Sequence, residues 1–531
     1  MPGTTSTRRA VAVGVGAAAL AGCTLSLPGD SRASRLGPLA ERQVLRLALD
    51  GDPETLDPAR VSFVDEIAVV MRVHSNLLAF DARGALVPEL AERLPAVSPD
   101  GKRLTFALRP GLVYSDGAPL RASDFSFSWQ RHVTPPSAGP YAHVGQVVES
   151  VRAVDDRTVE FALTEPAPWF LSVLTTWCGV PLREDVVARA GWTEPPHYVG
   201  CGPFVLTLRE RQNRLLLAAN PRYYQGPPTL AAVELSQLGD PATALSAYRN
   251  DELDVHTIRG EDLSVVQQDQ ALRRQLQQFP GTCTTFLSFN TTRAPYSLLG
   301  VRRAIATALD RAAYVSGPLG GLGTPATQLV PPGMPGHYRQ LAGQRRDLTA
   351  ARKHLADAGY ADPSRLPPLQ VTYAGGARAR VRAEALATQL REALAIAASA
   401  EPAESRAFSE AIRSPAAAPG AFVTGWCQDY PDPQAWYSAL FHSRSALSGT
   451  GWSSVDVDRM LDEANAERAP RRRDELYQRA AQRIADEAPV VFLYHETVSR
   501  LVKPWVHGLA PNPLELYEGQ ANTMGLRILK H

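Results

Sequence analysis

The sequence has few cysteines, almost no net charge and no apolar run long enough to cross a membrane. Its 531 residues include 5 cysteines, and 55 basic side chains nearly balance 54 acidic ones, which gives a formal net charge of +1. A chain without an excess of positive charge offers no electrostatic footprint for nucleic acid or for an anionic lipid surface. We therefore expect neither as a partner. Apolar residues make up 44% of the chain, which is typical of a globular protein.

The usual catalytic motifs are also missing. The sequence contains no GxSxG, no phosphate-binding loop ending in Gly-Lys, no calcium loop and no HExxH. The 11 histidines show no metal-ligand spacing, so we predict no metal site, no cofactor and no catalytic residue. A secreted peptidase stays open as a less favoured alternative, because absent motifs lower the odds of an enzyme without excluding one.

The first residues predict export. Arg8 and Arg9 precede a short apolar stretch over residues 10–21. A basic start, a short apolar run and small residues before a cleavage point form a secretory signal. A membrane span would need about 20 apolar residues, more than this stretch supplies. The arginine pair leaves both Sec and twin-arginine export open.

The end of this segment suggests a lipid anchor. Leu20-Ala21-Gly22-Cys23 resembles the bacterial lipobox, in which the cysteine becomes the lipidated first residue of the mature protein. We predict a signal peptide over residues 1–22, lipidation of Cys23 and attachment to the outer, extracytoplasmic face of the cell membrane, because several acyl chains suffice for stable anchoring. An ordinary signal peptide with a chance cysteine is the alternative. Removal of residues 1–22 takes away two arginines and lowers the net charge by two, to −1.

Four cysteines remain once Cys23 is assigned to lipid. They are Cys178, Cys201, Cys283 and Cys427. An even number in an oxidising compartment suggests two disulfides, although the count does not fix the pairing. We predict that all four are oxidised.

Length and periodicity predict an α/β protein with more than one lobe. A chain of this length exceeds what one compact core holds. Residues 23–42 are rich in Ser, Pro, Gly and Arg without a period, so we expect a flexible tether. Strands alternating with amphipathic helices indicate the α/β class. We predict strands at 44–49, 104–108, 159–163 and 490–493, and helices at 301–312, 349–358, 377–398 and 471–486.

One loop combines an aromatic, an acidic residue and two prolines. In the run from Gly425 to Pro433, Trp426 offers a flat apolar wall and Asp429 a negative charge. A carboxylate in a dry pocket suits a cationic group such as a peptide α-amino group. The alternative is that Asp429 forms a local turn and Trp426 packs in the core. From the residues alone, this alternative is favoured.

Ordered motifs over residues 45 to the C-terminus resemble the oligopeptide-binding proteins of bacterial ABC importers, within the peptide and nickel group (family 5) of extracellular solute-binding proteins. The matching strings are Leu56-Asp57-Pro58, Pro99-Asp100-Gly101-Lys102, Leu104 to Gly111, Tyr114 to Pro119, Ser128 to Arg131, Pro140-Tyr141-Ala142, Gly200 to Phe204, Asn220 to Tyr224, Phe289-Asn290, Val301 to Ala304, Asp310-Arg311 and Arg500 to Val506.

The resemblance implies a two-lobed periplasmic-binding-protein-like fold of class II (cluster C), with an extra α/β domain inserted in the first lobe. On this basis we expect lobe I to comprise 43–63, 201–282 and 498–531. The inserted domain would span 64–200, and lobe II 283–497. Such lobes close on a ligand by bending at a hinge.

The resemblance also assigns a peptide-binding site. Asp429 corresponds to the family Asp that pairs with the α-amino group of the ligand. Trp426 and Gly425 correspond to positions that line the pocket. Tyr141 and Val64 correspond to ligand contacts in the first lobe.

Cys283 and Cys427 stand at positions that are disulfide-linked in close family members, which leaves Cys178 and Cys201 as the expected second pair. The sequence departs from the family at four places near the site: Val423, Phe286, Ser288 and Glu496. Phe286 is still expected among the peptide-binding residues. These departures leave the preferred length and charge of the peptide open.

The function implied is capture of oligopeptides between the lobes, without catalysis, and delivery to the permease subunits of an ABC transporter. We expect the protein to be a monomer. A binder of another solute on the same fold, such as a metal chelate, heme, a sugar or a signalling peptide, is the main alternative.

Overall fold

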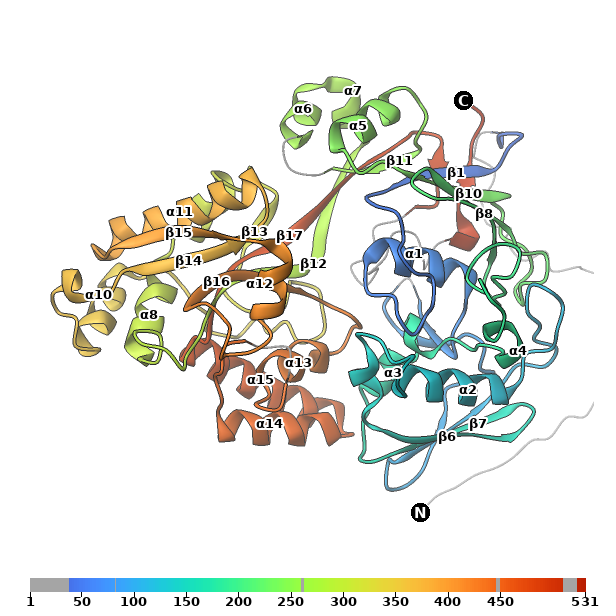
Figure 1. Cartoon of the computed structure of the whole chain (residues 1–531), viewed down its shortest axis with the longest axis horizontal. Helices are drawn as coiled ribbons and strands as arrows, with labels where there is room; N and C mark the ends of the chain where they lie inside the picture. The colour runs from blue at the N-terminus through green and yellow to red at the C-terminus, as the bar shows by residue number, and fades with distance from the viewer. Residues whose placement is uncertain (1–37, 82, 259–261, 446–448, 510–522) are drawn as a thin grey trace, which may run out of the picture.

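The computed structural model shows an α/β protein with two bodies joined by a pair of long strands (Figure 1). It describes residues 38–81, 83–258, 262–445, 449–509 and 523–531. The predicted signal peptide, Cys23 and most of the tether lie outside the described residues. In the part of the chain that the structure describes, we find no helix that is long and apolar enough to cross a membrane.

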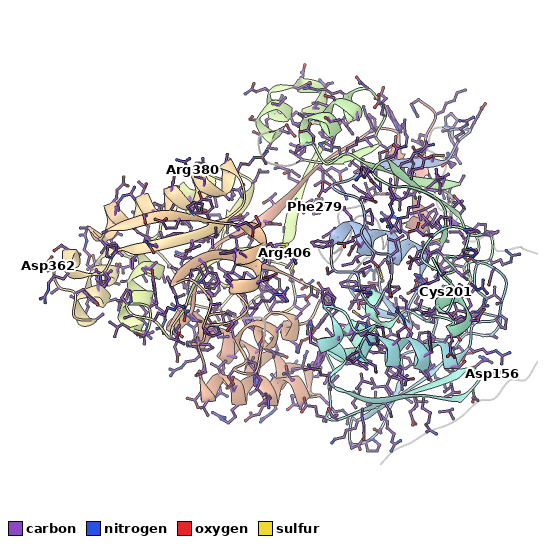
Figure 2. The ribbon with its side chains drawn as sticks, viewed as in Figure 1. Asp156, Cys201, Phe279, Asp362, Arg380 and Arg406 are labelled. Atoms are coloured by element: carbon purple, nitrogen blue, oxygen red, sulfur yellow. A yellow bond between two sulfur atoms is a disulfide. The ribbon has the colours of Figure 1, made fainter. Side chains whose placement is uncertain are left out.

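One 11-stranded sheet runs through both bodies. Its order is β15-β14-β16-β12-β17-β11-β1-β10-β9-β8, and β13 pairs with β17 beside this path. β12 (Leu276–Phe289) and β17 (Val490–Val502) are antiparallel neighbours that pass from one body to the other. Figure 2 shows Phe279 of β12 at this crossing. The expected limits of lobe II, residues 283–497, fall inside these two strands, and the division remains a prediction.

The first body contains lobe I. Its first strand, β1, shows the alternation of buried and exposed residues that was predicted from residue 44. Leu45, Leu47 and Leu49 of β1 are buried in one cluster, whereas the residues between them are partly exposed. The elements of this part are β1 (Val44–Leu49), β8 (Phe204–Glu210), β9 (Arg214–Ala219), β10 (Ala232–Gln237), α5 (Pro241–Arg249), β11 (Val255–Thr257), α6 (Asp262–Gln268), α7 (Gln270–Gln275), β18 (Val506–His507), η6 (Thr523–Gly525) and β19 (Arg527–Ile528).

The expected tether ends too late. Leu39 forms a β-bridge with Leu529, and the Ala40 amide donates to the Ile528 carbonyl at 2.9 Å. The last residues assigned to the tether therefore lie along the C-terminal strand. Their backbone groups form hydrogen bonds with that strand, whereas those of a free linker would bond to water.

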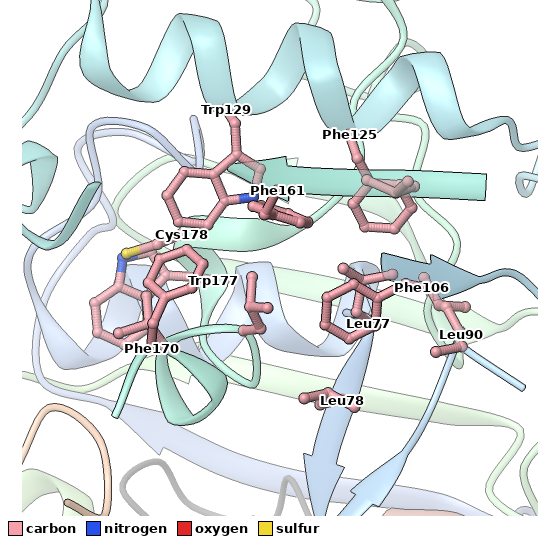
Figure 3. Close-up of a cluster of buried hydrophobic side chains, with 14 of the residues drawn as sticks. Leu77, Leu78, Leu90, Phe106, Phe125, Trp129, Phe161, Phe170, Trp177 and Cys178 are labelled. Atoms are coloured by element: carbon pink, nitrogen blue, oxygen red, sulfur yellow. The ribbon is translucent and has the colours of Figure 1, made fainter. Parts of the chain in front are cut away.

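The inserted domain has its own four-stranded sheet, in the order β4-β5-β7-β6, and its own core. Figure 3 shows this core, in which Trp129, Phe161 and Phe170 pack edge to face or tilted. The elements of this region are α1 (Val64–Val73), β2 (Leu78–Phe80), β3 (Leu86–Pro88), β4 (Ala96–Val97), β5 (Arg103–Ala107), α2 (Ala122–Val133), η2 (Ala142–Gly145), β6 (Val148–Asp155), β7 (Thr158–Leu163), α3 (Phe170–Val173), η3 (Trp177–Gly179) and α4 (Glu184–Val187).

Two of the quoted motifs fasten this domain to lobe I. Asp57 forms a buried ion pair with Arg131 of α2. At Gly202, a Cβ atom would lie 2.6 Å from the Val73 carbonyl carbon at the end of α1, so only glycine allows the two backbones to approach this closely. These motifs hold the domains together, and their described residues do not line either of the two cavities in the cleft that are described below.

The second body contains lobe II, with helices on both faces of its strands (Figure 1). Two buried clusters, one around α8–α11 and one around α13–α15, lie within it. Its elements are α8 (Leu299–Ala308), α9 (Arg311–Ser316), β13 (Gly323–Pro325), α10 (Leu348–Asp357), η4 (Pro363–Arg365), β14 (Leu369–Ala374), α11 (Ala377–Leu394), β15 (Ala398–Ala403), α12 (Ser405–Ala411), β16 (Ala421–Cys427), η5 (Pro433–Ala435), α13 (Tyr437–Phe441), α14 (Val455–Ala466) and α15 (Pro470–Glu487).

Two predicted helices have different ends in the structure. The helix expected over 301–312 is two helices, because Asp310 is extended and caps α9 by accepting from the Ala313 amide. The helix expected to reach residue 398 ends at Leu394, where Ala395 takes a left-handed conformation and the chain turns into β15.

Candidate functional site in the cleft between the lobes

The strand β16 leads into the predicted peptide-binding loop. Cys283 on β12 faces Cys427 on β16 in register, and their sulfur atoms are bonded. The predicted Cys283–Cys427 disulfide is therefore confirmed. It ties the end of β16 to a strand that also crosses between the two bodies.

The second predicted disulfide is wrong. Cys178 and Cys201 are buried free thiols. Cys178 lies in η3 next to Trp177 (Figure 3), whereas the Cys201 thiol donates to the Ser75 carbonyl at 3.7 Å. Both pack as small apolar residues, and burial raises the pKa of each thiol to about 12. An even number of cysteines therefore does not show that two of them lie within bonding distance.

The loop after Cys427 is held at several points. The backbone N–H of Gln428 donates to the Thr282 carbonyl at 3.0 Å. Farther along, Asp432 and Arg473 of α15 form a largely buried ion pair at 2.8 Å. Between these two points the Tyr430 ring stacks on Trp169 of the inserted domain, with ring centres 6.1 Å apart. The chain between Cys427 and Asp432 therefore has a fixed course, and it contacts the opposite body.

Asp429 sits in the middle of this loop. The Tyr141 hydroxyl of the inserted domain donates to its Oδ1 atom at 3.1 Å. Burial raises the pKa of Asp429 from 3.8 to about 7, and the hydrogen bond from Tyr141 opposes this shift. Within the described part of the chain, this is the one hydrogen bond that the carboxylate accepts. An ionised carboxylate has about four acceptor sites, so this group can accept more.

Tyr141 is positioned by a tight loop. At Gly139, a Cβ atom would lie 2.1 Å from the Ala59 carbonyl oxygen, so the loop rests directly on backbone of lobe I. The Tyr141 ring packs edge-on against Trp177, with ring centres 4.9 Å apart, and His143 stacks on it. The structure thus brings Tyr141 and Asp429 together from segments 288 residues apart.

Trp426 is both a wall and a core residue. Its indole Nε1 donates to the Ala435 carbonyl at 2.7 Å, and its ring packs against the cluster that contains Phe286. It also lines a cavity between the two bodies. The core-packing alternative for Trp426 is therefore partly right, but it does not remove the residue from the cleft.

A cavity of about 390 Å³ lies between the two bodies. Ser62, Pro140, Tyr141 and His143 line it from the first body. Lobe II contributes Phe286, Ser288, Ser409, Ile412, Arg413, Phe422, Thr424, Gly425, Trp426, Leu440, Phe441, Gly449, Thr450 and Val490. Four of the predicted peptide-binding residues thus share one cavity, with Asp429 bonded to one of them.

Val64 lies elsewhere in the cleft. It is the first residue of α1 and is largely exposed, with 58% of its surface accessible. It lines a second cavity, of about 300 Å³, together with Asp65 and Arg72 of the same helix and Arg378 of lobe II. Because Ser62 lines the first cavity and Val64 the second, the two cavities flank the start of α1.

The edge of β16 is open next to the first cavity, which Gly425 and Trp426 line. β14 pairs with β16 only at Ala421 and Phe422, whereas β12 pairs with all of β16 on the other side. Among the described strands, none pairs with residues 423–427 along the β14 side. Gly425, in this stretch, is exposed. A free strand edge presents unpaired N–H and C=O groups to which an extended chain can add.

Comparison with known proteins identifies the family. The model of "Bacterial extracellular solute-binding proteins, family 5 Middle" matches residues 85–448, which is more than half of the chain. The chain belongs to this family. Among its relatives, a probable deoxycholate-binding periplasmic protein of Escherichia coli is 30% identical over 89% of this chain and 91% of its own. A periplasmic oligopeptide-binding protein of Salmonella typhimurium is 28% identical over 93% and 94%.

Solved structures show the same two-lobed architecture. The Haemophilus influenzae oligopeptide-binding protein in complex with the peptide RPPGFSPFR superposes with a TM-score of 0.76, at 25% identity over 93% of this chain and all of that one. The unliganded open form of a periplasmic murein tripeptide-binding protein gives a TM-score of 0.79 at 24% identity, with 94% and 99% coverage. The predicted two-lobed α/β fold is confirmed.

The four departures from the family pattern lie at different distances from the cavity. Phe286 and Ser288 line it. Val423 packs with Leu287 in the cluster on the other face of β16, and Glu496 of β17 is exposed opposite Gly323. The effects of these departures on specificity remain predictions.

Several lining residues were missed in the sequence. Phe422 and Thr424 precede Trp426 by four and two residues, so strand alternation alone could have placed them on its face. Ile412, Leu440 and Phe441 come from α13 and from the end of α12, which no local pattern connects to β16.

Proposed function

We propose that this family 5 protein captures oligopeptides in the cleft between its lobes and delivers them to the permease subunits of an ABC importer. It acts by binding, as a monomer, without catalysis. Lipid on Cys23 would hold it at the outer face of the cell membrane. The names of the relatives describe binding proteins, and several of them name peptides.

One observation carries the proposal: the Asp429 carboxylate stands at the end of the free edge of β16. An extended peptide that adds to residues 423–427 would gain main-chain hydrogen bonds, which do not depend on its sequence. At the end of that edge its α-ammonium group would reach a carboxylate with acceptor capacity to spare. Affinity for peptides in general follows from these two features.

The same carboxylate argues against an amphipathic acid as the ligand. The E. coli relative is named for deoxycholate, which is an anion without an ammonium group. In this cleft such an anion would meet the charge of Asp429 when that group is ionised, and it would leave the buried carboxylate without a cationic partner. A peptide instead brings an ammonium group that pairs with the Asp429 carboxylate.

The ligand carried by the protein itself tests the proposal. The full-length protein is expressed in its native host, purified in its exported form and denatured, and the released small molecules are identified by mass spectrometry. We expect intact peptides. Recovery of a bile acid, a sugar, heme or a metal chelate instead, with no peptide, would refute the peptide assignment, and appearance of cleavage products on incubation with peptides would indicate a peptidase.

A further inference from the structure

The cavity beside Asp429 has an apolar inner end. Phe286 of β12, Leu440 and Phe441 of α13, and Val490 at the start of β17 line it, and all four are more than nine-tenths buried in the same core cluster of lobe II. Trp426 packs against that cluster from the cleft side. The cavity therefore extends from the cleft toward the core of lobe II.

The face of β16 decides which part of a ligand can enter. Phe422, Thr424 and Trp426 all line the cavity, whereas Val423 between them packs in the cluster on the opposite face. A chain added to the edge of β16 has the same two-residue alternation. One of its side chains can therefore point into the cavity while its neighbours point away.

The charges around the cavity are unbalanced. Among the described residues that line the cavity, Arg413 is the one with a permanent charge, and none is Asp or Glu. Arg413 is exposed and makes no ion pair with any described residue. Burial lowers the pKa of His143, which favours its neutral form. The other polar side chains among the described lining residues include the hydroxyl groups of serine, threonine and Tyr141, with Thr424 among them.

We propose that this cavity selects peptides that carry one large apolar side chain at a fixed distance from the amino terminus, and that it disfavours a lysine or arginine there. The inference rests on the proposed function. Burial of a large apolar side chain favours binding by about 10- to 100-fold over alanine. A cationic side chain would lose its hydration among apolar walls and would face Arg413 without a carboxylate to balance it. Thr424 is the specificity-determining position, because it lines the cavity from β16, between Phe422 and Trp426 on the same face of the strand.

The test is a set of seven tripeptides measured by isothermal titration calorimetry. Trialanine is the reference, and phenylalanine or lysine replaces each of its three residues in turn. At one position we expect phenylalanine to bind about tenfold or more tightly than alanine, and lysine to bind more weakly than alanine. At the other positions the three side chains should differ only a few-fold.

Substitution at Thr424 tests the location of the pocket. Thr424→Asp places a carboxylate in the cavity and should reverse the order of lysine and phenylalanine at that one position. Thr424→Val has nearly the same shape without the hydroxyl and should increase the advantage of phenylalanine. A change of the same size at all three positions would overturn the assignment.

The wild-type peptide series stands on its own if Thr424→Asp fails to fold. If trialanine binds but phenylalanine has no advantage at any position, the pocket inference is wrong and the proposed function stands. If none of the seven tripeptides binds, the pocket inference falls together with the peptide assignment.

Discussion

Peptide affinity should depend on pH because of Asp429. Burial raises the pKa of this carboxyl group from 3.8 to about 7 in the ligand-free protein. Between these values the folded, ligand-free protein holds a proton that the unfolded chain has released, so this group stabilises the free protein less as the pH rises through 7. A bound ammonium group favours the ionised form and returns the pKa toward its ordinary value. Peptide binding below pH 7 must therefore release a proton.

The size of the effect follows from the pKa. If the carboxyl group stays ionised in the complex, affinity falls about tenfold for each pH unit below 7, or roughly 30-fold between full ionisation and pH 5.5. At pH 6, binding should release about 0.9 proton per peptide. Above pH 8 the affinity falls again, because the α-amino group of the peptide, with a pKa of about 8, loses its charge.

Calorimetry in two buffers of different ionisation enthalpy measures the proton release directly. We expect release near one proton at pH 6, little at pH 7.7, and an affinity maximum between pH 7 and 8. Asp429→Asn is the matched control, since it keeps the shape of the side chain without the ionisation. Its affinity should be low and nearly flat between pH 5.5 and 7.5. Equal affinity of the wild-type protein at pH 5.5 and 7.5, without proton release, would refute the role given to this carboxylate.

Three further outcomes are expected. Thiol titration of unreduced, exported protein with Cys23 replaced by Ser should find two free thiols, Cys178 and Cys201, which react only after denaturation; a count of zero would show that these two cysteines are bonded after all. Replacement of both Cys283 and Cys427 by Ser should lower the free energy of unfolding by about 2–4 kcal/mol in a denaturant titration, and an unchanged midpoint would contradict the bridge. Tyr141→Phe removes the hydroxyl that opposes the effect of burial, so the midpoint of the pH dependence should move upward; an unchanged midpoint would show that this hydrogen bond is absent in solution.

The sequence predicted local structure where alternation was strong. β1, β5 and β7 follow the apolar positions closely, because a side chain on a half-buried strand faces either the core or the solvent. Errors arose at ends, where one side chain or one backbone conformation decides. Asp310 splits the helix expected over 301–312 by capping a second one. Ala395 ends α11 in a left-handed conformation that nothing in its composition announces.

Long-range pairing was predicted only through family resemblance. Cys283 and Cys427 are 144 residues apart, and their pairing came from the resemblance and not from spacing. The pairing of Cys178 with Cys201 rested on counting, and counting contains no distance. Tyr141 and Asp429 were each named, but the hydrogen bond between them requires both bodies to be in place.

The cavity itself could not be predicted from the sequence. Its walls come from β12, β16, α13 and the start of β17, whose separation along the chain exceeds any period. Thr424 and Phe422 were within reach, since they alternate with Trp426, but only the structure shows that their face borders an open space.

The claim that Asp429 binds the amino terminus of a peptide is tested most directly by blocking that terminus. The affinities of trialanine and N-acetyl-trialanine are measured at pH 7.5 on the wild-type protein and on Asp429→Asn. Since removal of one partner of a buried charge pair costs about 3–5 kcal/mol, and acetylation replaces the ammonium partner of Asp429 by a neutral amide, we predict that acetylation weakens binding to the wild-type protein by roughly 100-fold or more. On Asp429→Asn the two peptides should differ only a few-fold. Equal binding of both peptides to the wild-type protein would contradict the account.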